Sequence, residues 1–105
     1  MSFLNDLREA DIKRSKEWGG NPSLEFRTIE FAGEAGELCD AIKKKLRHLE
    51  GMKGGVGVII PIEEEIGDVL ITLDRLAQCF NIDLEKVTID KFNKTSEKHN
   101  FETKL

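Results

Sequence analysis

The sequence has no tyrosine, a single tryptophan and only two cysteines in 105 residues. Cys39 and Cys79 both lie in apolar helical patterns, so we expect buried, reduced thiols rather than a disulfide or a paired metal site. No stretch approaches the ~20 uninterrupted apolar residues that a membrane-spanning helix needs. The N-terminal residues have no basic flank and no apolar segment of signal length. These absences predict a cytoplasmic protein with no membrane-bound part.

Basic residues are also in short supply, 16 against 20 acidic ones, which gives a net charge of −4. A nucleic-acid-binding protein usually presents a net basic surface, so we expect no nucleic-acid partner. The chain has the length of a single domain, residues 1–105, and a core this small is marginal by itself. We therefore expect further burial between subunits, in a homodimer or a homotetramer.

Apolar residues recur at three- and four-residue steps over most of the chain, which is the spacing of amphipathic helices. The main interruption is the glycine-rich segment 51–61, with a short extended piece expected at 56–60. The predicted helices run over residues 3–18, from an N-cap at Ser23 to about 49, over 62–80, and from an N-cap at Asp83 to about 98. The pattern predicts an all-α fold with a four-helix bundle-type core, completed by oligomerisation.

Two pairs of acidic residues occupy matching positions on the second and third predicted helices. Glu34 and Glu37 form the first pair, and Glu65 and Asp68 form the second. Three-residue spacing puts both members of a pair on the same helical face, one turn apart. Apolar neighbours surround each pair and should draw both helices into the core. We therefore expect four carboxylates to face one another across a short gap.

Four converging carboxylates repel one another, and in a poorly solvated site some of them would have to take up protons. A divalent cation removes that conflict. The two pairs offer only oxygen ligands, which favours Mg²⁺ or Mn²⁺ over Zn²⁺. Since Mg²⁺ keeps several waters and takes further ligands from substrate phosphates, the pattern indicates metal-bound phosphate chemistry.

A glycine lies inside each pair, Gly36 and Gly67, and each costs about 1 kcal/mol of helix propensity relative to alanine. Small residues at equivalent places on both helices predict a close helix approach that brings the carboxylates together. The competing interpretation is a solvated helix face, which is what a single Glu-x-x-Glu step usually marks. Two such steps, each bedded in apolar residues, make the pattern more specific.

The segments Gly33-Glu34-Ala35-Gly36-Glu37-Leu38 and Glu64-Glu65-Ile66-Gly67-Asp68-Val69 resemble the MazG-like nucleotide pyrophosphohydrolases of the all-α NTP pyrophosphatase superfamily. The motif of that family is Glu-Glu-x-x-Glu, a spacer, and Glu-x-x-Asp. The spacer here, 38–64, is at the long end for the family. Gly33 is a departure, because it stands where the family has the first glutamate of its doubled pair. The likeness extends from about Trp18 to the C-terminus and includes the closing segment 91–98.

The resemblance implies a four-helix core assembled as a dimer or tetramer. It also implies Mg²⁺-dependent cleavage of a nucleoside triphosphate between the α- and β-phosphates, giving a nucleoside monophosphate and pyrophosphate, in house-cleaning or in control of a normal nucleotide pool. The implied metal ligands are Glu34, Glu37, Glu65 and Asp68. We assign the general-base role to Glu37 and keep Glu34 as the alternative.

Four further residues are candidate substrate ligands. Lys91 and Lys94 could meet phosphates and Asn93 could hydrogen-bond phosphate or base, although a solvated helix face is an equally good interpretation. Trp18 precedes a glycine loop and could stack on a base, while a role as a core anchor is slightly favoured. The basic run 43–47 would either steer a triphosphate or end a helix in solvent.

Two other enzyme classes fit the sequence less well. A di-iron carboxylate bundle needs Glu-x-x-His steps, and neither His48 nor His99 occupies such a position. The glycine-rich segment 51–57 lacks the Gly-Lys-Ser/Thr ending of a P-loop. The non-enzymatic alternative is a helical interaction or nucleotide-sensing module whose acids take no part in catalysis.

Overall fold

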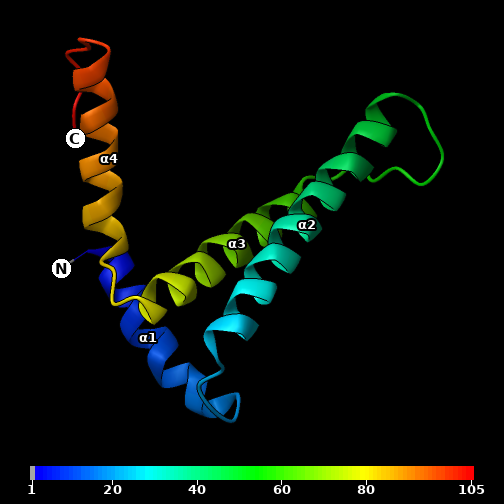
Figure 1. Ribbon diagram of the computed structural model, residues 1–105. Helices are drawn as coiled ribbons and strands as arrows, with labels where there is room; N and C mark the ends of the chain where they lie inside the picture. The colour runs from blue at the N-terminus through cyan, green and yellow to red at the C-terminus, as the bar shows by residue number, and fades with distance from the viewer. Residues whose placement is uncertain (1) are drawn as a thin grey trace. The chain divides into compact units, whose positions relative to one another are not determined.

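The computed structural model describes residues 2–105, which form four α-helices and no strand. These are α1 (Phe3–Glu17), α2 (Leu24–Leu49), α3 (Ile60–Cys79) and α4 (Leu84–Lys98) (Figure 1). The predicted all-α class is therefore confirmed, with every helix within two residues of its predicted bounds. None of the helices in the described part of the chain combines the length and hydropathy needed to cross a membrane.

Side-chain caps explain where the helices begin. Ser23 Oγ accepts a hydrogen bond from the Phe26 backbone N–H at 3.2 Å, and Asp83 Oδ1 accepts one from the Lys86 N–H at 3.1 Å. Both caps were expected from the sequence. α3 begins two residues earlier than predicted, because Pro61 occupies its second position, where a backbone N–H has no helical partner to lose.

The chain divides into two compact units. The α2–α3 unit, Asn21–Leu76, contains α2 and most of α3, which lie side by side and are joined by the loop 50–59 (Figure 1). The α1–α4 unit consists of Met1–Gly20 and Ala77–Leu105, and α1 contacts α4 within it. All four predicted metal ligands belong to the α2–α3 unit.

The loop between α2 and α3 does not contain the extended piece predicted for residues 56–60. It folds back along the end of α2, where the Val56 N–H donates to the Lys44 carbonyl at 3.0 Å. Gly55 lies so close to the His48 backbone that a Cβ at this position would overlap it. Contacts with α2 therefore take the place of strand pairing, and they depend on a glycine.

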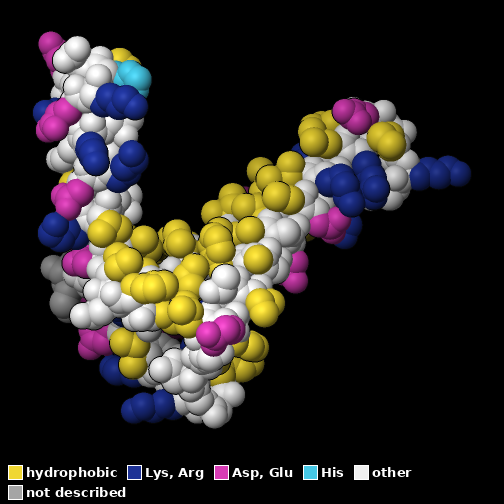
Figure 2. All heavy atoms as spheres, in the orientation of Figure 1, with side chains coloured by type: hydrophobic (Ala, Val, Ile, Leu, Met, Phe, Trp, Pro, Cys, Tyr) yellow, Lys and Arg dark blue, Asp and Glu magenta, His cyan; other side chains and the backbone are white. Residues whose placement is uncertain are grey.

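Large apolar side chains stay exposed along the α2–α3 unit, as Figure 2 shows. Ile29 on α2 is 73% exposed and Ile66 on α3 is 55% exposed. Cys39 and Cys79 are both exposed rather than buried. The prediction of burial was wrong because an apolar helical pattern shows which face avoids water, not whether the same chain covers that face.

Candidate metal centre

Three of the predicted ligands meet between α2 and α3. Glu34 and Glu37 come from α2 and Glu65 comes from α3, and one carboxylate oxygen of each lies within 4.8 Å of the other two. Glu34 and Glu65 are partly buried, whereas Glu37 is exposed. We call these three residues the acidic cluster. Their roles as ligands and base stay predictions.

The carboxylates of the acidic cluster are poorly compensated within the described residues. Oε2 of Glu34 and Oε2 of Glu65 are buried and have no hydrogen-bond partner among residues 2–105. Burial, followed by the charge of Glu37, raises the pKa of the Glu34 carboxyl above its ordinary value. The same two causes, in the same order, raise the pKa of Glu65. The site therefore holds negative charge that its own side chains do not neutralise.

Asp68 lies one turn beyond Glu65 on α3 and outside the acidic cluster. Its charge still contributes to the raised pKa of Glu34 and of Glu65, so it belongs to the same electrostatic environment. Its backbone carbonyl accepts a hydrogen bond from Thr72 Oγ1 at 3.0 Å, and Asp68 as a whole is exposed. Asp68 remains a predicted fourth ligand.

These residues fit a hard divalent cation. The donor set consists of carboxylate oxygens alone, which is the set that Mg²⁺ and Mn²⁺ prefer. Two of the oxygens are buried with no hydrogen-bond partner in the described part of the chain, a costly arrangement that a bound cation would relieve. The arrangement can therefore hold a metal ion and leave part of its coordination sphere to water and phosphate.

Gly36 and Gly67 do not bring the helices together in the way the sequence led us to expect. Within residues 2–105, a Cβ at either position would lie more than 4 Å from every atom of a neighbouring helix, and both residues are exposed. The carboxylates of Glu34, Glu37 and Glu65 converge although both glycines lie in open positions. Close approach at the glycines is not needed, and that prediction was wrong.

Gly67→Ala is therefore expected to raise the free energy of unfolding by about 0.5–1 kcal/mol, since alanine gains helix propensity and enters open space. For a domain of this size, the midpoint of thermal unfolding should rise by about 2–8 °C. Gly36→Ala is the matched variant on α2. A lower midpoint for both variants would show that a second copy of the chain covers these positions.

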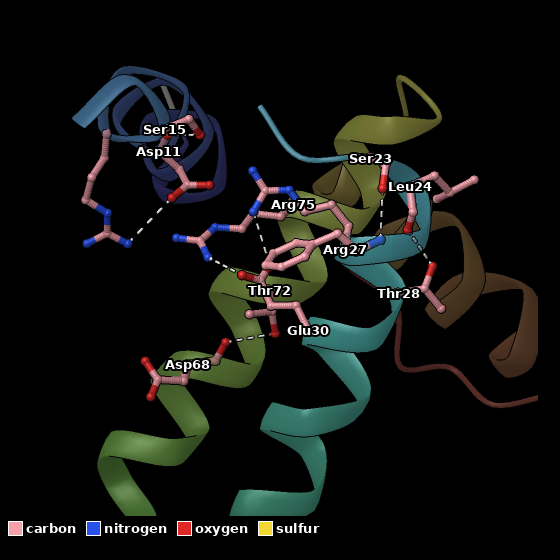
Figure 3. A network of polar contacts seen from close by, with 12 residues as sticks. Asp11, Ser15, Ser23, Leu24, Arg27, Thr28, Glu30, Asp68, Thr72 and Arg75 are labelled. Atoms are coloured by element: carbon pink, nitrogen blue, oxygen red, sulfur yellow. Dashed lines mark hydrogen bonds and ion pairs between the residues drawn. The ribbon is translucent and has the colours of Figure 1, made fainter. Parts of the chain in front are cut away.

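A second group of charges, missed by the sequence analysis, lies next to the acidic cluster. The Glu30 carboxylate pairs with Arg27 on its own helix at 3.1 Å and with Arg75 on α3 at 3.2 Å (Figure 3). We call these residues the arginine–glutamate cluster. The sequence does hold a signal for part of this cluster, because Arg27, Glu30 and Glu34 follow one another at steps of three and four residues on the same helical face.

The four candidate substrate ligands all belong to the α1–α4 unit. Lys91 and Lys94 are exposed on α4. The Asn93 side chain exchanges two hydrogen bonds with the backbone of Leu105, at 3.1 and 2.8 Å. Trp18 ends α1 and is 76% exposed, so the chain does not bury it as a core anchor. The substrate-binding roles stay predictions.

The described residues form four helices, and two of these, α2 and α3, bring three carboxylates together. This arrangement defines an all-α protein with a candidate divalent-metal centre. The model of the MazG nucleotide pyrophosphohydrolase domain matches residues 25–101, and the chain belongs to this family. No curated protein and no solved structure gives a significant match to the chain. Family membership points to a hydrolase that acts on nucleotides.

Proposed function

We propose that the chain, as one domain over residues 1–105, hydrolyses nucleoside triphosphates between the α- and β-phosphates. The products are a nucleoside monophosphate and pyrophosphate, and the reaction requires Mg²⁺, with Mn²⁺ as a substitute. Family membership supports the reaction class. The metal requirement is supported by one buried carboxylate oxygen on Glu34 and one on Glu65 that have no hydrogen-bond partner among the described residues.

In this proposal Glu34, Glu37, Glu65 and Asp68 hold the metal. Bound Mg²⁺ would neutralise phosphate charge and lower the pKa of a bound water. Glu37 is the general base, because it is the exposed member of the acidic cluster and can reach a water at the edge of the site. Glu34 and Glu65 are partly buried, which suits residues that hold an ion in a fixed position.

Lys91, Lys94, Asn93 and Trp18 are the proposed substrate ligands. Lys91 and Lys94 meet phosphates, and the exposed indole of Trp18 stacks on the base. Asn93 binds phosphate or base after giving up its two hydrogen bonds to the backbone of Leu105. The exposed apolar side chains of α2 and α3, including Ile29 and Ile66, support a homodimer or homotetramer. We place the activity in the cytoplasm, where it would clear or limit nucleotides.

A panel of canonical and modified nucleoside triphosphates, incubated with Mg²⁺, tests the proposed reaction. Pyrophosphate and the nucleoside monophosphate should appear in equal amounts, and EDTA should abolish both. Orthophosphate release would move cleavage to the terminal phosphate and contradict the proposal. Nucleotide binding without any product would instead support a nucleotide-sensing module.

A further inference from the structure

The arginine–glutamate cluster is largely withdrawn from water. The side chains of Arg27, Glu30 and Arg75 are 7%, 20% and 12% exposed. Each guanidinium contacts a different oxygen of the same carboxylate, Oε1 for Arg27 and Oε2 for Arg75. Charge-assisted bonds to both of its oxygens restrain the position and the orientation of this carboxylate. Glu30 therefore ties α2 to α3.

On α2 the cluster lies one helical turn from the candidate metal centre. Glu30 precedes Glu34 by four residues, which places the two side chains on the same face of α2. On α3, Arg75 follows Asp68 by seven residues, or two turns on the same face, with Thr72 between them (Figure 3). The tie between the helices thus joins the same two faces that carry the four predicted ligands.

We propose that the arginine–glutamate cluster positions the acidic cluster for metal binding, by fixing how α2 and α3 are aligned along each other. Glu30 and Arg75 are positioning residues in this proposal, and neither contacts the metal. The inference rests on the proposed function only through the metal site. In this proposal Glu30 is not a ligand, although it lies on the same face of α2 as Glu34, because both of its oxygens are engaged by guanidinium groups.

The variant Arg75→Met separates positioning from simple electrostatics. Removing a positive charge near an acidic site should by itself strengthen cation binding. If the guanidinium positions the ligands, the same variant should weaken binding, and loss of residues that orient metal ligands typically costs about 10–100-fold in affinity. Glu30→Gln should weaken binding to a similar extent, and Arg75→Lys should recover part of the affinity.

The experiment measures the dissociation constant of Mn²⁺ alone by titration calorimetry, with circular dichroism and thermal unfolding of each metal-free variant. Lys86→Met is the matched control, since it breaks an exposed ion pair with Asp90 on α4. We expect its Mn²⁺ affinity to equal that of the wild type. Arg75→Met should bind Mn²⁺ about 10–100-fold more weakly while keeping its helix content.

Three results would overturn the proposal. Tighter Mn²⁺ binding by Arg75→Met would leave only an electrostatic effect. Unchanged Mn²⁺ affinity with a lower unfolding midpoint would leave only a role in stability. Unchanged Mn²⁺ affinity with a raised KM for the triphosphate would make Arg75 a phosphate ligand. Failure of the proposed function shows differently, as a wild-type protein that binds Mn²⁺ but releases no pyrophosphate.

Discussion

Glu37→Gln is expected to lower kcat for pyrophosphate release by about 10²–10⁴-fold, the usual contribution of a general base. Glutamine keeps the shape of the side chain and one carbonyl oxygen, but it cannot accept a proton from an attacking water. Glu37 is the exposed member of the acidic cluster, so its substitution should disturb the packing of α2 least. The rate should be measured at saturating Mg²⁺ and triphosphate.

The matched control is Glu63→Gln, an exposed glutamate in the first turn of α3 and outside the acidic cluster. This variant should retain the wild-type rate. Glu34→Gln distinguishes the two candidate bases, because a metal-holding Glu34 should lose Mg²⁺ affinity, whereas a base should lose rate at saturating Mg²⁺. Wild-type turnover by Glu37→Gln would show that the general base is another residue.

The bounds of the helices could be predicted from the sequence because their signals are local. Ser23 and Asp83 cap their helices through backbone N–H groups three residues further on. Whether Cys39 is buried or exposed could not be predicted in the same way, and the structure shows that it is exposed. Its helical pattern identifies an apolar face, and whether that face is covered depends on elements far away in the sequence or on a second subunit.

In the candidate site, too, the local features could be predicted from the sequence, whereas the long-range contact could not. The three-residue steps place Glu34 and Glu37 on one face of α2, and the family motif identifies the face of α3 that carries Glu65. The contact between Glu30 and Arg75 joins residues 45 positions apart. In the sequence each of them looks like an ordinary charge on a solvated helix surface, and only the structure shows that they are paired and mostly buried.

The stability of the folded protein is expected to depend strongly on pH and on bound Mg²⁺. Burial, then the neighbouring acids, raise the pKa of Glu34 and Glu65 in the folded metal-free protein above the ordinary value of 4.5. A folded state that binds protons more tightly than the unfolded chain is stabilised by acid. The contribution of these groups should therefore be complete below about pH 4.5 and lost as the pH rises through their raised pKa.

Mg²⁺ should reverse this dependence, because it binds the ionised carboxylates and competes with protons. At a concentration 100 times its dissociation constant, a ligand stabilises the folded state by about 2.7 kcal/mol. That stabilisation corresponds to roughly 10–20 °C in the unfolding midpoint of a domain this size. The gain should be large at pH 7.5 and should shrink as the pH falls toward 5.

Glu65→Gln tests the origin of both effects in one protein. Its metal-free form should unfold at a higher temperature than the wild type at pH 7.5, because a like charge has been removed from the acidic cluster. The same variant should lose most of the gain from Mg²⁺, since one of the converging oxygens is gone. Thermal unfolding of both proteins, with EDTA or Mg²⁺ at pH 5 and pH 7.5, gives the comparison. A Glu65→Gln protein that keeps the full Mg²⁺ gain would place the metal away from α3, and the proposed centre would then be wrong.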